Sequence, residues 1–63
     1  MDTKRAFELI DAYDTKDCMA LLIVYAPDLH TQVVELARIG ADAHTILAAA
    51  RERVKQAYLR EDN

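Results

Sequence analysis

The side chains with the most reactive chemistry in this sequence are one cysteine and two histidines, Cys18, His30 and His44. A cysteine activated by a histidine can act as a nucleophile, and both side chains are common zinc ligands. No two of the three have the spacing of a zinc finger or lie one helical turn apart. Cys18 stands in an apolar run, where burial raises the pKa of a thiol and lowers its reactivity. We therefore expect no catalytic residue, no metal site and no cofactor, and we expect that the protein is not an enzyme.

Three aspartates recur at every third position near the start of the chain. Asp11, Asp14 and Asp17 supply the carboxylate oxygens that Ca²⁺ and Mg²⁺ prefer. An aspartate directly before a helix also caps it, because its carboxylate accepts a hydrogen bond from the first turn. Asp14 fits this role, and Asp17 would then lie where the helix dipole favours a negative charge. We expect a helix start to separate the three carboxylates, so that they do not share a cation.

Basic side chains gather towards the end of the chain and could bind phosphate groups. On a helix, Arg51 and Lys55 lie one turn apart on the same side. Glu52 and later acidic residues alternate with the cations, so we expect a solvated helix face with local ion pairs. The net charge of the chain is −3, which repels nucleic acid unless the cations share one face. The four cations concerned are Arg51, Arg53, Lys55 and Arg60.

A helix-turn-helix is the alternative interpretation of residues 29–58. The spacing from Gly40 to Ile46 resembles that between the turn and the recognition helix of many bacterial regulators. The interval from Ala37 to Gly40 is one residue shorter than in that pattern, and alanines occupy positions where base-reading side chains are expected. A helical hairpin with a glycine stop explains the same residues. In the DNA-binding interpretation, the contacts would come from His44, Thr45, Arg51 and Lys55.

Helical periodicity begins at the start of the chain. Asp2 or Thr3 can cap a first helix, which we expect to reach about Tyr13. Apolar residues recur on one side of this helix at three-to-four spacing. They are Ala6, Phe7, Ile10 and Tyr13.

Proline and glycine mark the boundaries of the later helices. Pro27 suits the first position of a helix, and Gly40 suits the position just after its end. Asp42 can cap a last helix, whose final residues 60–63 should fray. The buried faces predicted for these two helices consist of Leu29, Val33, Leu36 and Ala37, and of Ile46, Leu47, Ala50, Val54, Ala57 and Tyr58.

The apolar run from Cys18 to Ala26 has two interpretations. Several of its residues favour strands, and periodicity does not distinguish a buried strand from a buried helix. We favour a helix, because a strand would have no partner except the same strand of a second copy. Such a helix is apolar in nearly every direction, and three short helices cannot cover all of it. The run would therefore form an interface between copies, which we assign to Met19, Leu21, Leu22, Ile23, Val24 and Tyr25.

The size of the chain limits what it can stabilise alone. A domain of 63 residues buries only about 60% of its unfolded surface, so a single core is marginal. One cysteine allows no internal disulfide. With 52% apolar residues, the chain has more apolar surface than so small an interior can accept. We therefore predict a single all-α domain over residues 1–63, a small bundle of three to four short helices completed by homo-oligomerisation.

These observations together predict a class of function. The chain shows no secretory signal, its one cysteine suits a reducing compartment, and its longest apolar run is too short to span a bilayer. We expect a cytoplasmic protein with no membrane partner. The predicted function is a non-enzymatic protein-interaction module, a small self-associating regulator or adaptor that forms a homodimer and binds another protein. Nucleic acid is a partner only in the helix-turn-helix alternative.

Overall fold

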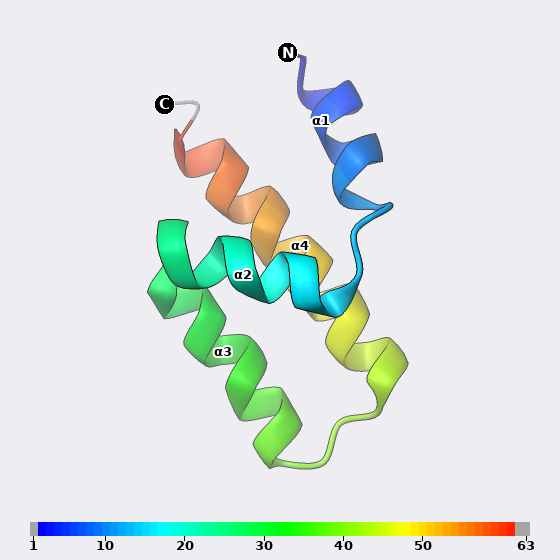
Figure 1. Ribbon diagram of the computed structural model, residues 1–63, viewed down its shortest axis with the longest axis vertical. Helices are drawn as coiled ribbons and strands as arrows, with labels where there is room; N and C mark the ends of the chain where they lie inside the picture. The colour runs from blue at the N-terminus through cyan, green and yellow to red at the C-terminus, as the bar shows by residue number, and fades with distance from the viewer. Residues whose placement is uncertain (1, 62–63) are drawn as a thin grey trace.

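Four α-helices make up the described part of the chain, residues 2–61 of the computed structural model (Figure 1). They are α1 (Thr3–Ile10), α2 (Thr15–Tyr25), α3 (Pro27–Arg38) and α4 (Ala43–Glu61). No strand occurs within residues 2–61, so the all-helical prediction is confirmed and the run from residue 18 to 26 is a helix that ends in a break. The radius of gyration of the Cα atoms is 11.2 Å, which is that of a compact chain.

Aspartates set the starts of three helices. The carboxylate oxygens of Asp2, Asp14 and Asp42 each accept a hydrogen bond of 2.8 Å from the backbone N–H three residues further on. This bond satisfies one of the N–H groups that have no partner within the first turn of a helix. The capping roles predicted for Asp14 and Asp42 are confirmed, and Asp2, not Thr3, caps α1.

The first helix is shorter than the sequence predicted. It ends at Ile10, and the following N–H groups of Ala12 and Tyr13 bond to carbonyls only three residues back, at 3.1 and 3.0 Å. This tight turn ends α1 before Asp14, the extended residue that caps α2. The prediction that α1 reaches Tyr13 is therefore wrong by about one turn.

Proline and glycine mark helix boundaries at the positions predicted from the sequence. Pro27 is the first residue of α3, and Ala26 alone separates that helix from α2. Gly40 has a positive φ of 89°, and the N–H groups of Gly40 and Ala41 bond to the carbonyls of Ala37 and Leu36. These two bonds form a Schellman motif, which requires a left-handed residue that glycine adopts without strain. Of the predicted fraying segment, residues 60–61 are helical and residues 62–63 lie outside the described part.

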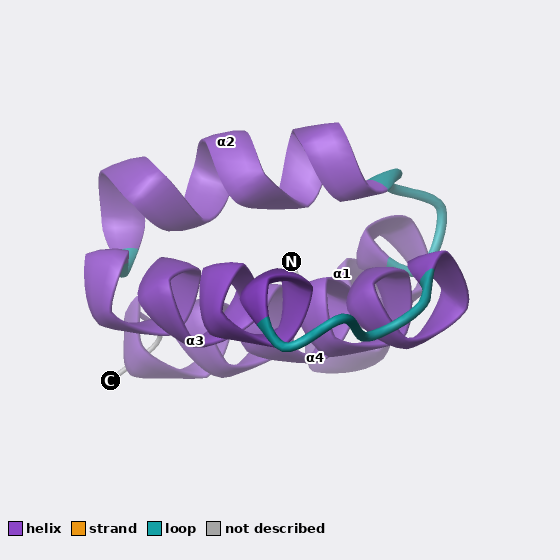
Figure 2. Cartoon of the chain, turned by 90° about the horizontal axis from the view of Figure 1, so that it is seen from below, coloured by secondary structure: helices purple, strands orange, loops and turns teal. Residues whose placement is uncertain are grey.

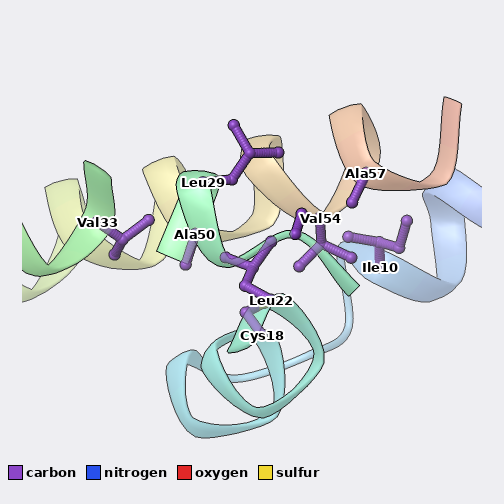
Figure 3. Close-up of a cluster of buried hydrophobic side chains, with 9 residues drawn as sticks. Ile10, Cys18, Leu22, Leu29, Val33, Ala50, Val54 and Ala57 are labelled. Carbon is purple, nitrogen blue, oxygen red and sulfur yellow. The ribbon is translucent and has the colours of Figure 1, made fainter. Parts of the chain in front are cut away.

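The helices form two layers. Seen from below, α2 lies above a layer that contains α1, α3 and α4 (Figure 2). The longest helix, α4, contacts each of the other three. The core lies between α2 and this layer, where side chains from all four helices meet (Figure 3). It consists of Ile10, Cys18, Leu22, Ala26, Leu29, Val33, Ala50, Val54 and Ala57.

Small side chains dominate this core. Its largest fully buried residues are Leu22, Leu29, Val33 and Cys18. Leu36, Ile46, Leu47 and Tyr58, which the sequence placed on buried faces, are only partly buried. Ala37, predicted to be buried, is exposed because the last turn of α3 extends beyond α2 (Figure 1).

Candidate functional site: the outer face of α2 and the adjoining groove

The two sides of α2 differ sharply in burial. Leu22 is 0% exposed and lies in the core, whereas Ile23, Val24 and Tyr25 are 56%, 70% and 61% exposed. Met19 and Leu21, the remaining members of the predicted interface, are partly buried. Leu22 therefore belongs to the interior of the single chain. We use "outer face of α2" for the exposed residues Ala20, Ile23, Val24 and Tyr25.

An apolar outer face is unusual for a helix with one buried side. Surface helices normally turn charged and polar residues to solvent. On α2 such residues occur only in the first turn, at Lys16 and Asp17, while the second half exposes three large apolar side chains in succession. Single exposed apolar residues are common in proteins, but a contiguous group marks an interaction surface.

A groove of about 310 Å³ adjoins this face. Its walls come from three helices, with Leu9 and Ile10 of α1, Leu21 and Tyr25 of α2, and Val54 and Tyr58 of α4. Because α2 supplies one wall, the groove and the outer face of α2 are neighbouring parts of one apolar surface. Sequence analysis did not find the groove, because its position depends on how α1 and α2 are spaced on α4.

One charged residue lines the groove, and one aromatic contact lies beside it. Glu61 is the one charged residue among its lining side chains in the described chain. The Tyr58 ring packs against Phe7 in an edge-to-face contact, with centroids 6.3 Å apart and planes at 73°. Such pairs contribute beyond their buried area, so this contact fixes the position of α1 on α4.

The basic residues of α4 bind other parts of the chain. Arg51 donates a 2.8 Å hydrogen bond from Nε to the backbone carbonyl of Tyr13, in the loop between α1 and α2. Lys55 lies 2.7 Å from the carboxylate of Asp11 and 5.2 Å from the ring centroid of Phe7. Arg51 and Lys55 do share one side of the helix, as predicted, and from that side they join α4 to α1 and its loop.

The other two cations join α4 to α3. Arg53 donates from Nε to Gln32 Oε1 at 2.8 Å, and Arg60 lies 3.0 Å from Asp28. The hydrogen bond and charge of Arg60 hold the pKa of Asp28 below its ordinary value. The prediction of local ion pairs is thus correct only for the 3.8 Å contact of Arg53 with Glu52. The seven-residue spacing of Arg53 and Arg60 was the available signal that both face one neighbouring helix.

The four DNA-contact candidates differ in accessibility. His44 and Thr45 are exposed at the start of α4, and the N–H of Thr45 is bonded to Asp42. Arg51 and Lys55 are partly buried against the loop and helix described above. DNA binding stays a prediction, with His44 and Thr45 as its freely accessible residues.

The cysteine and the histidine of α3 show no catalytic or metal-binding arrangement in the described chain. Cys18 is fully buried, and burial raises the pKa of its thiol against the opposing effect of the Arg51 charge. A raised pKa lowers the thiolate fraction and hence the nucleophilicity at neutral pH. His30 is partly buried on α3. In residues 2–61, no three histidine, cysteine or acidic side chains gather closely enough to bind a metal ion.

Known proteins give no further guide to this surface. Comparison of the chain with models of protein families, with curated proteins and with solved structures found no match. Within the described residues, no helix combines the length and the apolar character needed to cross a bilayer.

Proposed function

We propose that this protein is a non-enzymatic interaction module that self-associates through the outer face of α2 and serves as a small regulator or adaptor. The observation that carries the proposal is the exposure of Ile23, Val24 and Tyr25 in succession on a helix whose opposite side forms the core. A second copy is the partner of choice, because association of identical chains gives both copies cover for the same apolar residues.

The free energy that burial of these exposed side chains would contribute is large for a chain of this size. Burying one Leu-sized side chain contributes roughly 1.5–3 kcal/mol, whereas a small domain has a total stability of about 5 kcal/mol. Two such residues left in water would therefore forfeit an amount comparable with the whole stability of the fold. Binding a partner through the outer face of α2 recovers this energy.

The test compares one substitution at two exposed isoleucines. Ile23 lies on the outer face of α2 and is 56% exposed, whereas Ile39 follows α3 and is 71% exposed. Ile23→Lys should lower the association constant at least about tenfold, because a lysine there must be desolvated in the interface. Ile39→Lys adds the same charge away from α2 and should leave association unchanged. Sedimentation equilibrium measures both constants.

Thermal unfolding provides the second measurement. The melting temperature of the parent should rise with protein concentration, because association stabilises only the folded state. Parent protein that stays at 7.1 kDa at high micromolar concentration, with a melting temperature independent of concentration, would refute the proposal. Equal effects of the two lysine substitutions would also show that α2 is not the interface.

A further inference from the structure

The layered arrangement leaves room for a second helix beside α2. In the upper layer of Figure 2, α2 lies alone above α1, α3 and α4. The groove lies beside the second half of α2, with α1 and the second half of α4 providing the other walls. A helix placed in the groove would contact the Leu21 and Tyr25 side of α2. The upper layer would then contain two helices.

We propose that the occupant of this groove is α2 of a second copy, with each copy inserting its α2 beside that of the other. This inference rests on the proposed self-association and specifies its geometry. The result is a three-layered dimer with the two α2 helices in the middle and the remaining helices of each copy outside. The second α2 must lie alongside the first, while the other helices of the second copy lie on the opposite side of this pair. Only a two-fold axis that runs along the helices gives this arrangement. The two α2 helices are therefore parallel and in register.

This geometry gives each side of α2 a defined partner. Cys18 and Leu22 face the core of their own copy. Leu21 and Tyr25, which line the copy's own groove, face the same residues of the second α2 across the axis. The rest of the outer face is then turned to the opposite copy, where Ile23 and Val24 enter its groove. Exposed Ala20, halfway along α2, leaves space for the close approach of the opposite layer.

The available area matches a stable dimer. The Cα atoms of the chain extend over 35 × 20 × 13 Å, so its broad face has a footprint of about 700 Å² before side chains are counted. A standard interface buries about 800 Å² of each partner. The broad face that bears α2 and the groove is thus comparable in size with what a standard interface needs.

Disulfide trapping tests the parallel register. Packed helices lie about 8–10 Å apart with Cα atoms about 2.3 Å from each axis, which brings facing Cα atoms within disulfide reach. In Tyr25→Cys, oxidation should link the two copies into a covalent dimer at protein concentrations where the parent self-associates. The parent serves as a control because Cys18 is fully buried. Ile39→Cys is the matched exposed control away from the interface and should remain unlinked.

A charge in the groove provides an independent measurement. Leu9 lines the groove and is 37% exposed, while Val34 lies outside it on α3 and is 38% exposed. Leu9→Lys should weaken association at least about tenfold, and Val34→Lys should change it little.

The outcomes separate the geometry from self-association itself. A dimer that links through Ala20→Cys but not through Tyr25→Cys, and that tolerates Leu9→Lys, would have its α2 helices stacked through their Ala20 sides, with the grooves empty. That result overturns insertion and leaves the proposed function intact. A chain that stays monomeric throughout overturns both.

Discussion

The helices α2 and α4 both contribute to the core, but their other sides have different surroundings. From α4, long basic side chains reach the loop after α1, the end of α1 and two positions on α3. In residues 2–61, both ion pairs that join different segments have their cation on α4. The second half of α2 has no such side chains and exposes Ile23, Val24 and Tyr25.

This difference shows two ways to stabilise a helix in a small chain. The alkyl stems of arginine and lysine cover apolar surface while their charged ends find partners on neighbouring segments. Through these contacts, α4 is joined to the other helices of the same copy. We therefore regard α4 as the organising helix of the fold, and we propose that association covers the exposed side of α2.

The largest expected effect comes from the inner side of α2. Leu22→Ala removes the side chain of a fully buried leucine and should cost about 2–5 kcal/mol of unfolding free energy, because the cavity it leaves closes only partly. Much of the chain would then be unfolded at 25 °C. Ile23→Ala on the exposed side should change the stability of the monomer by less than about 0.5 kcal/mol. Urea unfolding at low protein concentration, followed by circular dichroism, measures both values, and similar losses would contradict the division of α2 into an inner and an outer side.

Removal of a contact of α4 should give the next largest loss of unfolding free energy. Arg51→Met removes the hydrogen bond to the carbonyl of Tyr13 while retaining most of the apolar stem, and we expect a loss of about 1–3 kcal/mol. Arg38→Met is the matched control. The Arg38 side chain is 74% exposed and pairs only with Glu35 in its own helix, so its loss should cost less than about 0.5 kcal/mol. A loss for Arg51→Met no larger than that of the control would mean that α4 does not organise the loop.

The turn before α4 should have a similar or smaller effect. Gly40 has a φ of 89°, and a Cβ atom added there would meet no atom within 4 Å. Gly40→Ala should nevertheless cost about 1–2 kcal/mol, because a left-handed conformation is strained for alanine. Gly40→Asn should recover part of this loss, since asparagine adopts that conformation more readily. Equal losses in the two variants would point to a cause other than backbone conformation.

Local signals in the sequence predicted most of the fold. Asp14, Gly40 and Asp42 act through hydrogen bonds to residues a few positions away, and Pro27 acts through its own fixed backbone angle, so their roles are readable without a structure. The end of α1 was missed because the tight turn after Ile10 has no glycine or proline to mark it.

The candidate site was predictable only in part. The apolar character of α2 indicated that some of it remains uncovered, but which side is exposed depends on the crossing of α2 over the other helices. Leu22 and Ile23 are adjacent and equally apolar in the sequence, yet one is fully buried and the other is 56% exposed. The groove and the partners of Arg51 and Lys55 depend on contacts between residues far apart in the chain, which periodicity does not reveal.

Acid should lower the free energy of unfolding by protonating carboxyls that bond to residues of α4, and we expect this effect to be the smallest of the series. The pKa of Asp28 is lowered first by its hydrogen bond from Arg60, and the pKa of Asp42 first by its hydrogen bond from the backbone N–H of Thr45. Because both carboxyls bind protons less readily in the folded chain than in the unfolded chain, their contribution to stability is complete at neutral pH. It decreases as the pH falls below the unfolded pKa of about 3.9 and is lost below the folded values.

In Asp28→Asn/Asp42→Asn, the asparagine at 42 can still cap α4, but neither position titrates. The free energy of unfolding should therefore fall less between pH 5 and pH 2.5 in this variant than in the parent, as measured by urea unfolding at each pH. A parent and variant with equal acid dependence would assign the acid sensitivity to carboxylates other than Asp28 and Asp42.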